Sequence, residues 1–161
     1  MTLSISRIVI LLIGSNIDPI TNIQRAIKEI SGLFQINQQS SFWETQPIGT
    51  EGDNFINLAL SVSTSIDYDI LKFDILRNIE IRLGRERIPD KFAPRTIDID
   101  IILDGDVIID MNIWNYAYIA VPVAELVPNL IHLETNQTLG EIAATIIKKS
   151  WIKKHPAGIP Q

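Results

Sequence analysis

Apolar positions along the chain recur with two different periods, one typical of strands and the other of helices. Residues 8–13 form an unbroken apolar run rich in β-branched side chains, which predicts a strand buried on both faces. Residues 55–62 and 95–103 alternate between apolar and less apolar positions, as half-buried strands do. Residues 20–34 and 71–83 instead repeat apolar residues at helical spacing, so each segment predicts an amphipathic helix.

The ends of the two helices carry signals of their own. Asp18 followed by Pro19 predicts a helix start with a side-chain cap and a first-turn proline. Asp67 or Asp69 can open the second helix, and Gly84 is its expected stop.

The segments between these elements complete a recognisable order. Residues 35–43 are polar but strand-like, and residues 45–53, with a proline and two glycines, predict a loop. Asp104-Gly105 is a turn signal that predicts a hairpin with residues 107–109. The order β-α-β-β-α-β predicts a ferredoxin-like α+β sandwich, in which helices cover one face of a mainly antiparallel sheet, with a C-terminal hairpin and helix as additions.

The C-terminal third adds an unusual aromatic segment. Trp114, Tyr116 and Tyr118 crowd into five residues, as a binding wall or a packed cover would require. Pro122 is expected to start a short helix. A capping box over 138–141 predicts the start of the last helix.

Composition limits the class of protein. With 46% hydrophobic and 20% charged residues, residues 1–161 are expected to form a single globular domain. The absence of cysteine excludes disulfides, thiolate catalysis and cysteine-ligated zinc. The net charge of −5 offers no general basic surface for nucleic acid, and no apolar run is long enough for a membrane span or a secretory signal. We therefore expect a cytoplasmic protein that contacts neither nucleic acid nor membrane.

Two carboxylates share one face of a predicted strand. Ile97, Ile99 and Ile101 point toward the core. Asp98 and Asp100 point to the opposite face, where their like charges repel and favour a cation. Paired carboxylates with open coordination positions suit magnesium shared with substrate phosphates. An ordinary solvated strand face is the alternative, because the motif is short.

Basic residues crowd into the segment around and before this pair. Six of the 14 Lys and Arg residues fall within nineteen positions, and Glu80, Glu86 and Asp90 are the acidic residues that offset them there. A basic patch beside two carboxylates is what a metal–nucleotide site requires, although a solvated, salt-bridged helix end has the same composition. The six residues are Arg77, Arg82, Arg85, Arg87, Lys91 and Arg95.

A second candidate site lies on the strand predicted over 55–62. Phe55 and Asn57 share its less apolar face. An aromatic ring beside an amide is a suitable platform for a flat heterocycle, which stacks on the ring and hydrogen-bonds to the amide. A core phenylalanine and a sheet-edge asparagine are the alternative.

Four motifs occur in an order that resembles one known family. They are Ile13-Gly14-Ser15-Asn16, Trp43-Glu44-Thr45-x-Pro47-Ile48-Gly49, Phe55-Ile56-Asn57 and Pro94-Arg95-Thr96-Ile97-Asp98-Ile99-Asp100. Together they are similar to the 6-hydroxymethyl-7,8-dihydropterin pyrophosphokinases of folate biosynthesis. The resemblance extends over most of the chain, from about residue 8 to about residue 128.

The resemblance implies a reaction, its cofactors and roles for individual residues. The family transfers pyrophosphate from ATP to the hydroxymethyl group of the reduced pterin and releases AMP, with two magnesium ions, and it suggests a monomer. By resemblance, Asp98 and Asp100 are the metal ligands, and the catalytic residues are Asp98, Asp100, Arg95 and Arg85. ATP would contact Glu80, Arg85, Arg87, Arg95 and Ile101. The pterin would contact Thr45, Ile48, Phe55, Asn57 and Tyr118.

The segment before Pro122 departs from the family pattern. Residues 111–121 are shorter than the corresponding loop and contain no Arg, Lys or His, whereas the family carries basic residues there. Each charge-assisted hydrogen bond lost costs about 1.5–3 kcal/mol, so weaker ATP binding or slower turnover is expected. Gln46 and Phe92 are milder departures, at positions where proline and tryptophan are common.

Three functions remain open from the sequence. The first is a working pterin pyrophosphokinase, the second is a pterin-binding homologue with little transferase activity, and the third is a structural or interaction domain, since this fold hosts many functions. Magnesium-dependent AMP formation that requires the pterin distinguishes the first from the second. Binding of the pterin excludes the third.

Overall fold

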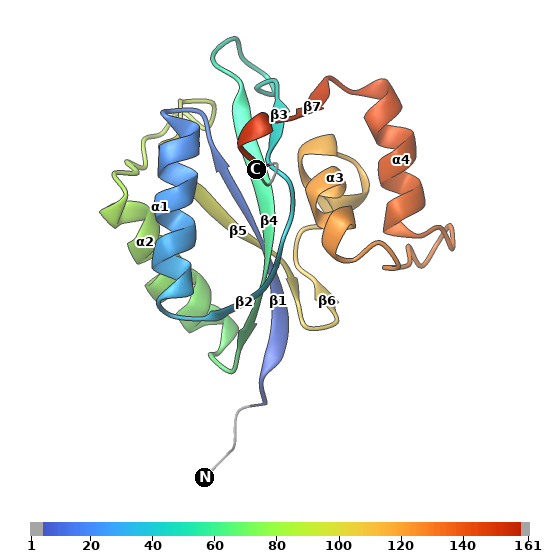
Figure 1. Ribbon diagram of the computed structural model, residues 1–161, viewed down its shortest axis with the longest axis horizontal. Helices are drawn as coiled ribbons and strands as arrows, with labels where there is room; N and C mark the ends of the chain where they lie inside the picture. Colours follow the sequence, from blue (N-terminus) through green and yellow to red (C-terminus); the bar gives the residue numbers. More distant parts are fainter. Residues whose placement is uncertain (1–4, 159–161) are drawn as a thin grey trace.

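The computed structural model describes residues 5–158, and a seven-stranded sheet runs through the middle of the molecule with helices on both faces (Figure 1). In chain order the elements are β1 (Arg7–Ser15), α1 (Pro19–Ser31), β2 (Gln35–Gln39), β3 (Trp43–Thr45), β4 (Phe55–Thr64), the π-helix η1 (Ile70–Leu76), α2 (Arg77–Arg82), β5 (Asp98–Asp104), β6 (Val107–Ile108), the 3-10 helix η2 (Met111–Trp114), α3 (Ala117–Leu126), α4 (Leu139–Lys149), β7 (Ile152–Lys154) and the 3-10 helix η3 (Pro156–Gly158).

The sheet has the order β6-β5-β1-β4-β3-β7, and β2 pairs with β4 beside this path. All of the pairings are antiparallel. Strand β1 lies between β4 and β5, which explains why its sequence is an uninterrupted apolar run. The arrangement confirms the ferredoxin-like α+β sandwich expected from the sequence, including the hairpin that joins β5 to β6.

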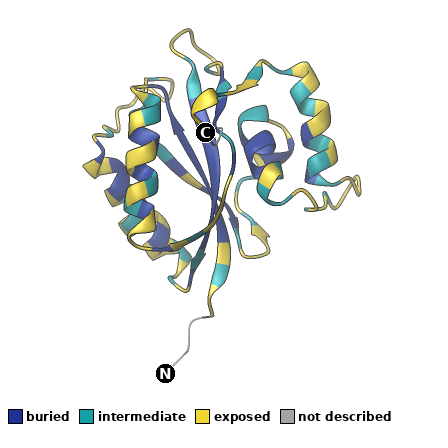
Figure 2. Cartoon of the chain, viewed as in Figure 1, coloured by how far each residue is buried: buried dark blue, intermediate teal, exposed yellow. Residues whose placement is uncertain are grey.

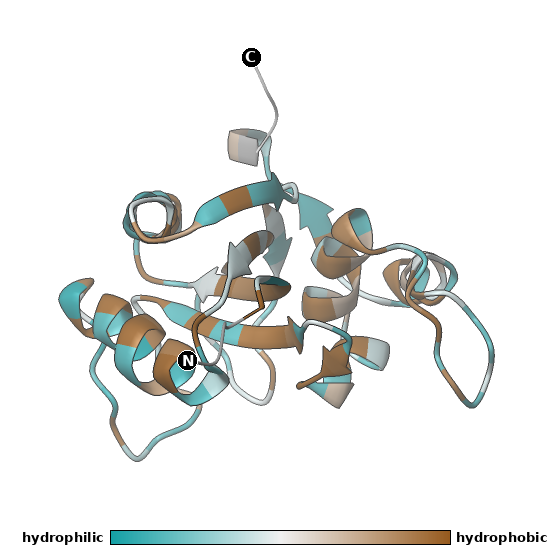
Figure 3. Ribbon diagram, turned by 90° about the horizontal axis from the view of Figure 1, so that it is seen from below, coloured by the Kyte–Doolittle hydropathy of each residue, from teal (hydrophilic) through white to brown (hydrophobic). Residues whose placement is uncertain are grey.

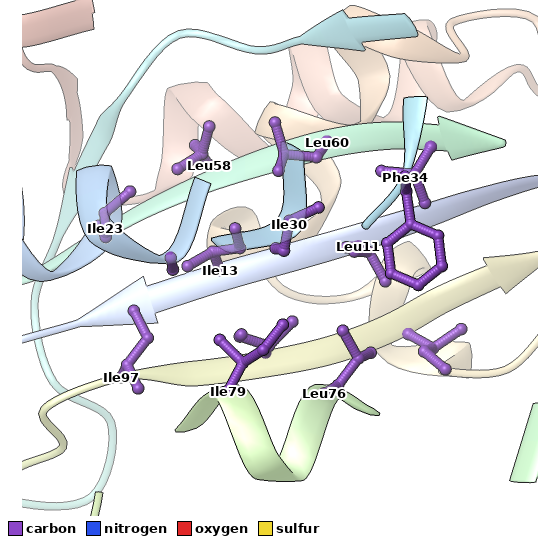
Figure 4. Packing of buried hydrophobic residues seen from close by; sticks show 14 of the residues in the cluster. Leu11, Ile13, Ile23, Ile30, Phe34, Leu58, Leu60, Leu76, Ile79 and Ile97 are labelled. Carbon is purple, nitrogen blue, oxygen red and sulfur yellow. The ribbon is translucent and has the colours of Figure 1, made fainter. Parts of the chain in front are cut away.

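Helices α1 and α2 cover one face of the sheet (Figure 1). Leu11 and Ile13 of β1 and Leu58 and Leu60 of β4 meet the helices on this face, and all four side chains are fully buried (Figure 4). Ile23 of α1 packs against them. Burying a side chain of this size contributes roughly 1.5–3 kcal/mol, so this layer accounts for much of the folding free energy.

Strand β5 divides its side chains between the two faces as predicted. Ile97, Ile99 and Ile101 belong to the core under α1 and α2. Asp98 and Asp100 point to the other face of the sheet. Strand alternation alone therefore determines that the two carboxylates stand on the same side.

The second face of the sheet is covered only in part. Helix α3 packs on it and α4 packs against α3, around a second apolar cluster that includes Trp43, Ile113, Ile119 and Leu139. Helix α3 has more buried residues than α4, much of which is exposed or half-buried (Figure 2). The helices carry both teal and brown segments (Figure 3). Helices α1 and α4 are amphipathic, whereas α3 is apolar over most of its length. The part of this face beside Asp98 is left open. Within residues 5–158, no helix has the length and apolar character to cross a membrane.

The ends of three elements differ in detail from the predictions. Helix α3 begins at Ala117 and contains Pro122 internally, because the fully buried turn from Ile119 to Val123 is held by packing on all sides. Helix α1 begins at Pro19, as predicted, but Asp18 has a positive φ of 42° and makes no capping hydrogen bond through its side chain, so the predicted side-chain cap is wrong. Strand β1 runs from Arg7 to Ser15 and so extends beyond the predicted apolar run at both ends.

The second helix and the edge strands also differ from expectation. The helix starts as a π-helix, whose wider turns place Leu76 rather than Ile75 in the core.

The single strand expected over 35–43 is two strands, β2 and β3, because residues 40–42 leave the ladder. Strand β7, which the sequence did not reveal, pairs with β3. The capping box between Thr138 and Glu141 is confirmed.

Candidate active site

A cleft of about 510 Å³ opens on the uncovered face, where β1 ends and β5 begins. Strands β1, β4 and β5 form its floor, residues 45–50 and 91–93 form two walls, and the segment that leads into α3 forms a third. The volume is within the range of small-molecule sites.

The register of the sheet places the floor residues in two rows. In the first row Gly14 of β1 lies opposite Asn57 of β4 and opposite Asp98 of β5. In the second row Leu12 lies opposite Asp100 on the β5 side. Because neighbouring strands are about 4.8 Å apart, the amide and the carboxylates face the same small volume from two sides.

Asp98 is held by two arginines. Its Oδ1 accepts a hydrogen bond from Arg85 Nη1, and its Oδ2 accepts one from Arg95 Nη1 at 2.9 Å. Arg85 Nη1 also donates to the carbonyl of Ile97 at 3.0 Å. The Arg85 side chain is only 11% exposed, whereas that of Arg95 is 34% exposed. Arg85 therefore orients the carboxylate, and Arg95 retains a face toward solvent.

Asp100 is accessible from the cleft but is surrounded by protein on the other sides. Burial, the charge of Asp98 and a hydrogen bond to Asp98 raise the pKa of the Asp100 carboxyl to about 8, while Arg95 opposes the shift. Two carboxylates that cannot both ionise freely form a site that favours an added positive charge.

The donor set fits a hard divalent cation. Asp98 and Asp100 both line the cleft and offer carboxylate oxygens. Across residues 5–158, no group of three or more His, Cys, Asp or Glu is gathered closely enough to hold a metal ion by itself. Magnesium commonly binds through one or two carboxylates and completes its coordination with water and substrate phosphates, so two carboxylates are sufficient.

Glu80 lies behind the cleft instead of lining it. The side chain is 4% exposed, its Oε2 accepts from Arg87 Nη2 at 3.1 Å and lies 3.6 Å from Arg85 Nη1, and its Oε1 accepts from the backbone N–H of Ile99 at 3.4 Å. Burial and the nearby charge of Asp98 raise the pKa of Glu80, and the two arginines oppose this shift. Its contacts make Glu80 a support for Arg85 and Arg87.

Three other residues expected at ATP also lie outside the cleft lining. The side chain of Ile101 packs in the core under α1 and α2 and is 5% exposed. Arg85 and Arg87 are paired with Glu80, and neither lines the cleft. Of the expected ATP contacts, only Arg95 lines it.

All five residues expected at the pterin line the same cleft. Asn57 and Thr45 are buried side by side, and Asn57 Nδ2 donates to Thr45 Oγ1 at 2.9 Å. Phe55 and Ile48 stand beside them, and Tyr118 faces them from α3. Burial and the charges of Asp110, Asp100 and Asp98 raise the pKa of the Tyr118 hydroxyl to about 12, so this phenol stays neutral.

The cleft also contains residues that the sequence interpretation did not assign. Tyr116 lies beside Tyr118 with a ring-centroid distance of 5.8 Å, and Asn112, Lys91 and Phe92 complete the walls. Their signal was present in the aromatic cluster and the basic segment, but side-chain direction in a loop cannot be read from spacing.

Ser15 and Asn16 connect the two halves of the site. Ser15 Oγ donates to the carbonyl of Thr96 at 2.6 Å. The backbone N–H of Asn16 donates to the Arg95 carbonyl at 3.1 Å, and Asn16 Oδ1 accepts from the Arg95 N–H at 2.7 Å. Asn16 Nδ2 donates to the carbonyl of Asp53 at 3.4 Å. The end of β1 thus holds in place the segment that precedes β5 and the segment that precedes β4.

The chain matches one family model and several known proteins. The family model described as 7,8-dihydro-6-hydroxymethylpterin-pyrophosphokinase (HPPK) matches residues 10–128. A 2-amino-4-hydroxy-6-hydroxymethyldihydropteridine pyrophosphokinase from Haemophilus influenzae is 28% identical over 156 residues, which cover 89% of this chain and 96% of that protein. The enzyme of the same name from Aquifex aeolicus is 33% identical over 131 residues, with 74% and 80% covered.

Other relatives are longer than this chain. The folic acid synthesis protein FOL1 from Dictyostelium discoideum is 35% identical over 138 residues, which cover 79% of this chain but only 20% of that protein. The crystal structure of Plasmodium falciparum HPPK-DHPS with pteroate superposes with a TM-score of 0.71 at 12% identity and covers 92% of this chain and 44% of the other. At 12% identity, the likeness to the Plasmodium falciparum structure shows the fold alone.

The family model spans more than half of the chain, and the residues it covers include the Asp98–Asp100 pair and the Phe55–Asn57 strand. The chain therefore belongs to the family of 7,8-dihydro-6-hydroxymethylpterin pyrophosphokinases, the ATP-dependent diphosphotransferases of folate biosynthesis that pass pyrophosphate to the hydroxymethyl group of a reduced pterin.

Proposed function

We propose that this chain transfers pyrophosphate from ATP to 6-hydroxymethyl-7,8-dihydropterin in the cleft between β4 and β5. The observation that carries the proposal is the meeting of two separately predicted groups. The carboxylates Asp98 and Asp100 and the heterocycle platform of Phe55 and Asn57 come from different strands, yet all four line one cleft.

The half of the cleft on β3 and β4 suits the pterin. Among residues 5–158, the Asn57 side chain hydrogen-bonds to Thr45 through one N–H, so its Oδ1 and second N–H can offer an acceptor and a donor to the polar edge of the ring. Phe55 and Tyr118 provide aromatic faces on the cleft wall, and Ile48 provides apolar contact.

The half of the cleft on β5 suits the phosphates. Arg95 and Lys91 line it and supply positive charge, while Arg85 holds Asp98 in place. Asp98 and Asp100 are the residues that would hold magnesium, and we expect two ions. When bound, magnesium would neutralise phosphate charge and make the pterin hydroxyl a better nucleophile.

As part of the same proposal, the domain acts as a monomer in the cytoplasm on small-molecule substrates. The net charge of −5 supports the absence of nucleic-acid binding. The short, uncharged segment from η2 to α3 lies against this cleft, so the arginine and lysine residues on the β5 side are the ones that would hold the phosphates.

The test is an AMP-release assay with ATP, magnesium and fresh reduced pterin. We expect AMP from the wild-type chain only when both magnesium and the pterin are present. Asp98→Ala should nearly abolish it, whereas Asp106→Ala, on the exposed hairpin turn, should not. Bound pterin without any AMP from the wild-type chain would instead show a binding homologue.

A further inference from the structure

Gly14 occupies the centre of the cleft floor, between the two halves of the site. It lines the cleft and lies opposite Asn57 on one neighbouring strand and Asp98 on the other. A glycine inside a strand has no side chain to pack and weakens the sheet. Such a glycine often marks a place where a ligand or another group must come close.

The backbone conformation does not explain the glycine. Among the described residues, the glycines with positive φ are Gly49, Gly52, Gly84 and Gly105, and Gly14 is not one of them. Any residue could therefore adopt the backbone of Gly14, and the reason for glycine lies in the space above it.

Asn57 fills that space. A Cβ atom on Gly14 would lie 2.7 Å from Asn57 Oδ1 and 3.8 Å from its Cγ, and the first of these distances is a steric overlap. Asn57 is held from the other side, because its Nδ2 donates to Thr45 Oγ1 at 2.9 Å and both residues are buried. The amide cannot retreat without losing this hydrogen bond.

We propose that Gly14 is a positioning residue of the pterin site. By lacking a side chain, it allows the Asn57 amide to lie close against β1 in the orientation that Thr45 sets. The inference rests on the proposed function, since Asn57 is the residue assigned to the polar edge of the pterin. The nearest neighbours of the added Cβ belong to Asn57 and, at 3.9 Å, to the Ile56 carbonyl, so the carboxylate half is not displaced.

The experiment is to measure pterin affinity and magnesium–ATP affinity separately for the wild-type chain and Gly14→Ala. We expect the pterin affinity to fall about tenfold, because one or more hydrogen bonds of the amide are lost, while the ATP affinity stays unchanged. Gly32→Ala is the matched control, since Gly32 has an ordinary φ of −75° and its added Cβ would have no neighbour nearer than 3.5 Å. It should alter neither affinity.

A double-mutant cycle with Asn57→Ala separates this role from general damage to the sheet. If Gly14 acts through Asn57, Gly14→Ala causes no further loss of pterin affinity once the amide is gone. The double variant also has room for the new Cβ, so it should recover any stability that Gly14→Ala loses.

The other possible results would reject either the role of Gly14 or the proposed function. Equal losses of pterin and ATP affinity, or the same pterin loss with and without the Asn57 amide, would reject the role of Gly14. If the wild-type chain binds the pterin and Gly14→Ala binds it equally well, only this inference fails. If the wild-type chain does not bind the pterin, the proposed function fails together with it.

Discussion

The two halves of the cleft are built in different ways. On the amide side, Thr45 and Asn57 stand on paired strands, are buried, and are joined by one neutral hydrogen bond. On the carboxylate side, Asp98 is held by Arg85 and Arg95, which come from a segment over 85–96 without helix or strand.

The difference matches the tasks that the two halves would perform. Recognition of a rigid ring requires donors and acceptors in fixed positions, which strands provide. Handling of a charged, flexible phosphate chain requires several cations, which can adjust when they lie on a loop.

The largest expected effect is on the carboxylate side. Asp100→Asn keeps the shape of the side chain but removes its charge, which weakens its hold on magnesium. We expect AMP formation to fall by about 10³-fold, because the phosphate charge is then less well neutralised. Pterin affinity, measured by calorimetry, should stay the same. Asp106→Asn on the exposed turn is the control. A parallel loss of pterin affinity would mean that the halves are not independent.

Removal of Arg85 should affect folding more than removal of Arg87. Arg85→Ala leaves Asp98 and Glu80 without a nearly buried partner, and we expect a loss of about 3 kcal/mol in the free energy of unfolding. Arg87 is 52% exposed, so Arg87→Ala should cost much less. Urea unfolding of both variants provides the comparison, and equal losses would contradict the supporting role of Arg85.

On the amide side the expected effects are smaller and confined to the pterin. Asn57→Ala should weaken pterin binding about tenfold. Thr45→Val should weaken it by less, because it keeps the Asn57 amide and removes only the hydrogen bond that orients it. Magnesium–ATP affinity should not change in either variant. A loss of ATP affinity in Thr45→Val would argue against separate halves.

The smallest effect is a dependence of stability on pH in the absence of metal. The pKa of Asp100 is raised to about 8, from an ordinary value of 3.8, so the folded chain binds more protons than the unfolded chain between these values. The stability contributed by the protonated form is therefore lost as pH rises toward 8. The melting temperature of Asp100→Asn should exceed that of the wild-type chain at pH 8 by more than at pH 5. Added magnesium should raise the melting temperature of the wild-type chain and reduce this gap.

A gap that is the same at both pH values would show that Asp100 is ionised in the folded, metal-free chain. Burial and the charge of Asp98 would then not raise the pKa of Asp100 as expected.

Local signals were sufficient for the parts of the fold that depend on neighbouring residues. The alternation around Asp98 predicted which face carries the carboxylates, and the capping box at Thr138 predicted the start of α4. The start of α3 was wrong because Pro122 is tolerated where the surrounding helix is buried. The π-helix at the start of the second helix was also missed, because its wider turns depend on how Leu71 and Leu76 pack against the sheet.

The amino-acid sequence was enough to predict the order of the main strands and helices along the chain, the faces of the strands, and the residues that are candidates for binding a cation and a flat ring. Which of these residues meet is settled by the folded structure. It brought Asn57, Gly14 and Asp98 into one row, and it placed Glu80 behind Arg85 instead of in the cleft. The physical reason is that strand and helix periods are local properties of the chain, whereas cross-strand register and burial arise from contacts between distant segments.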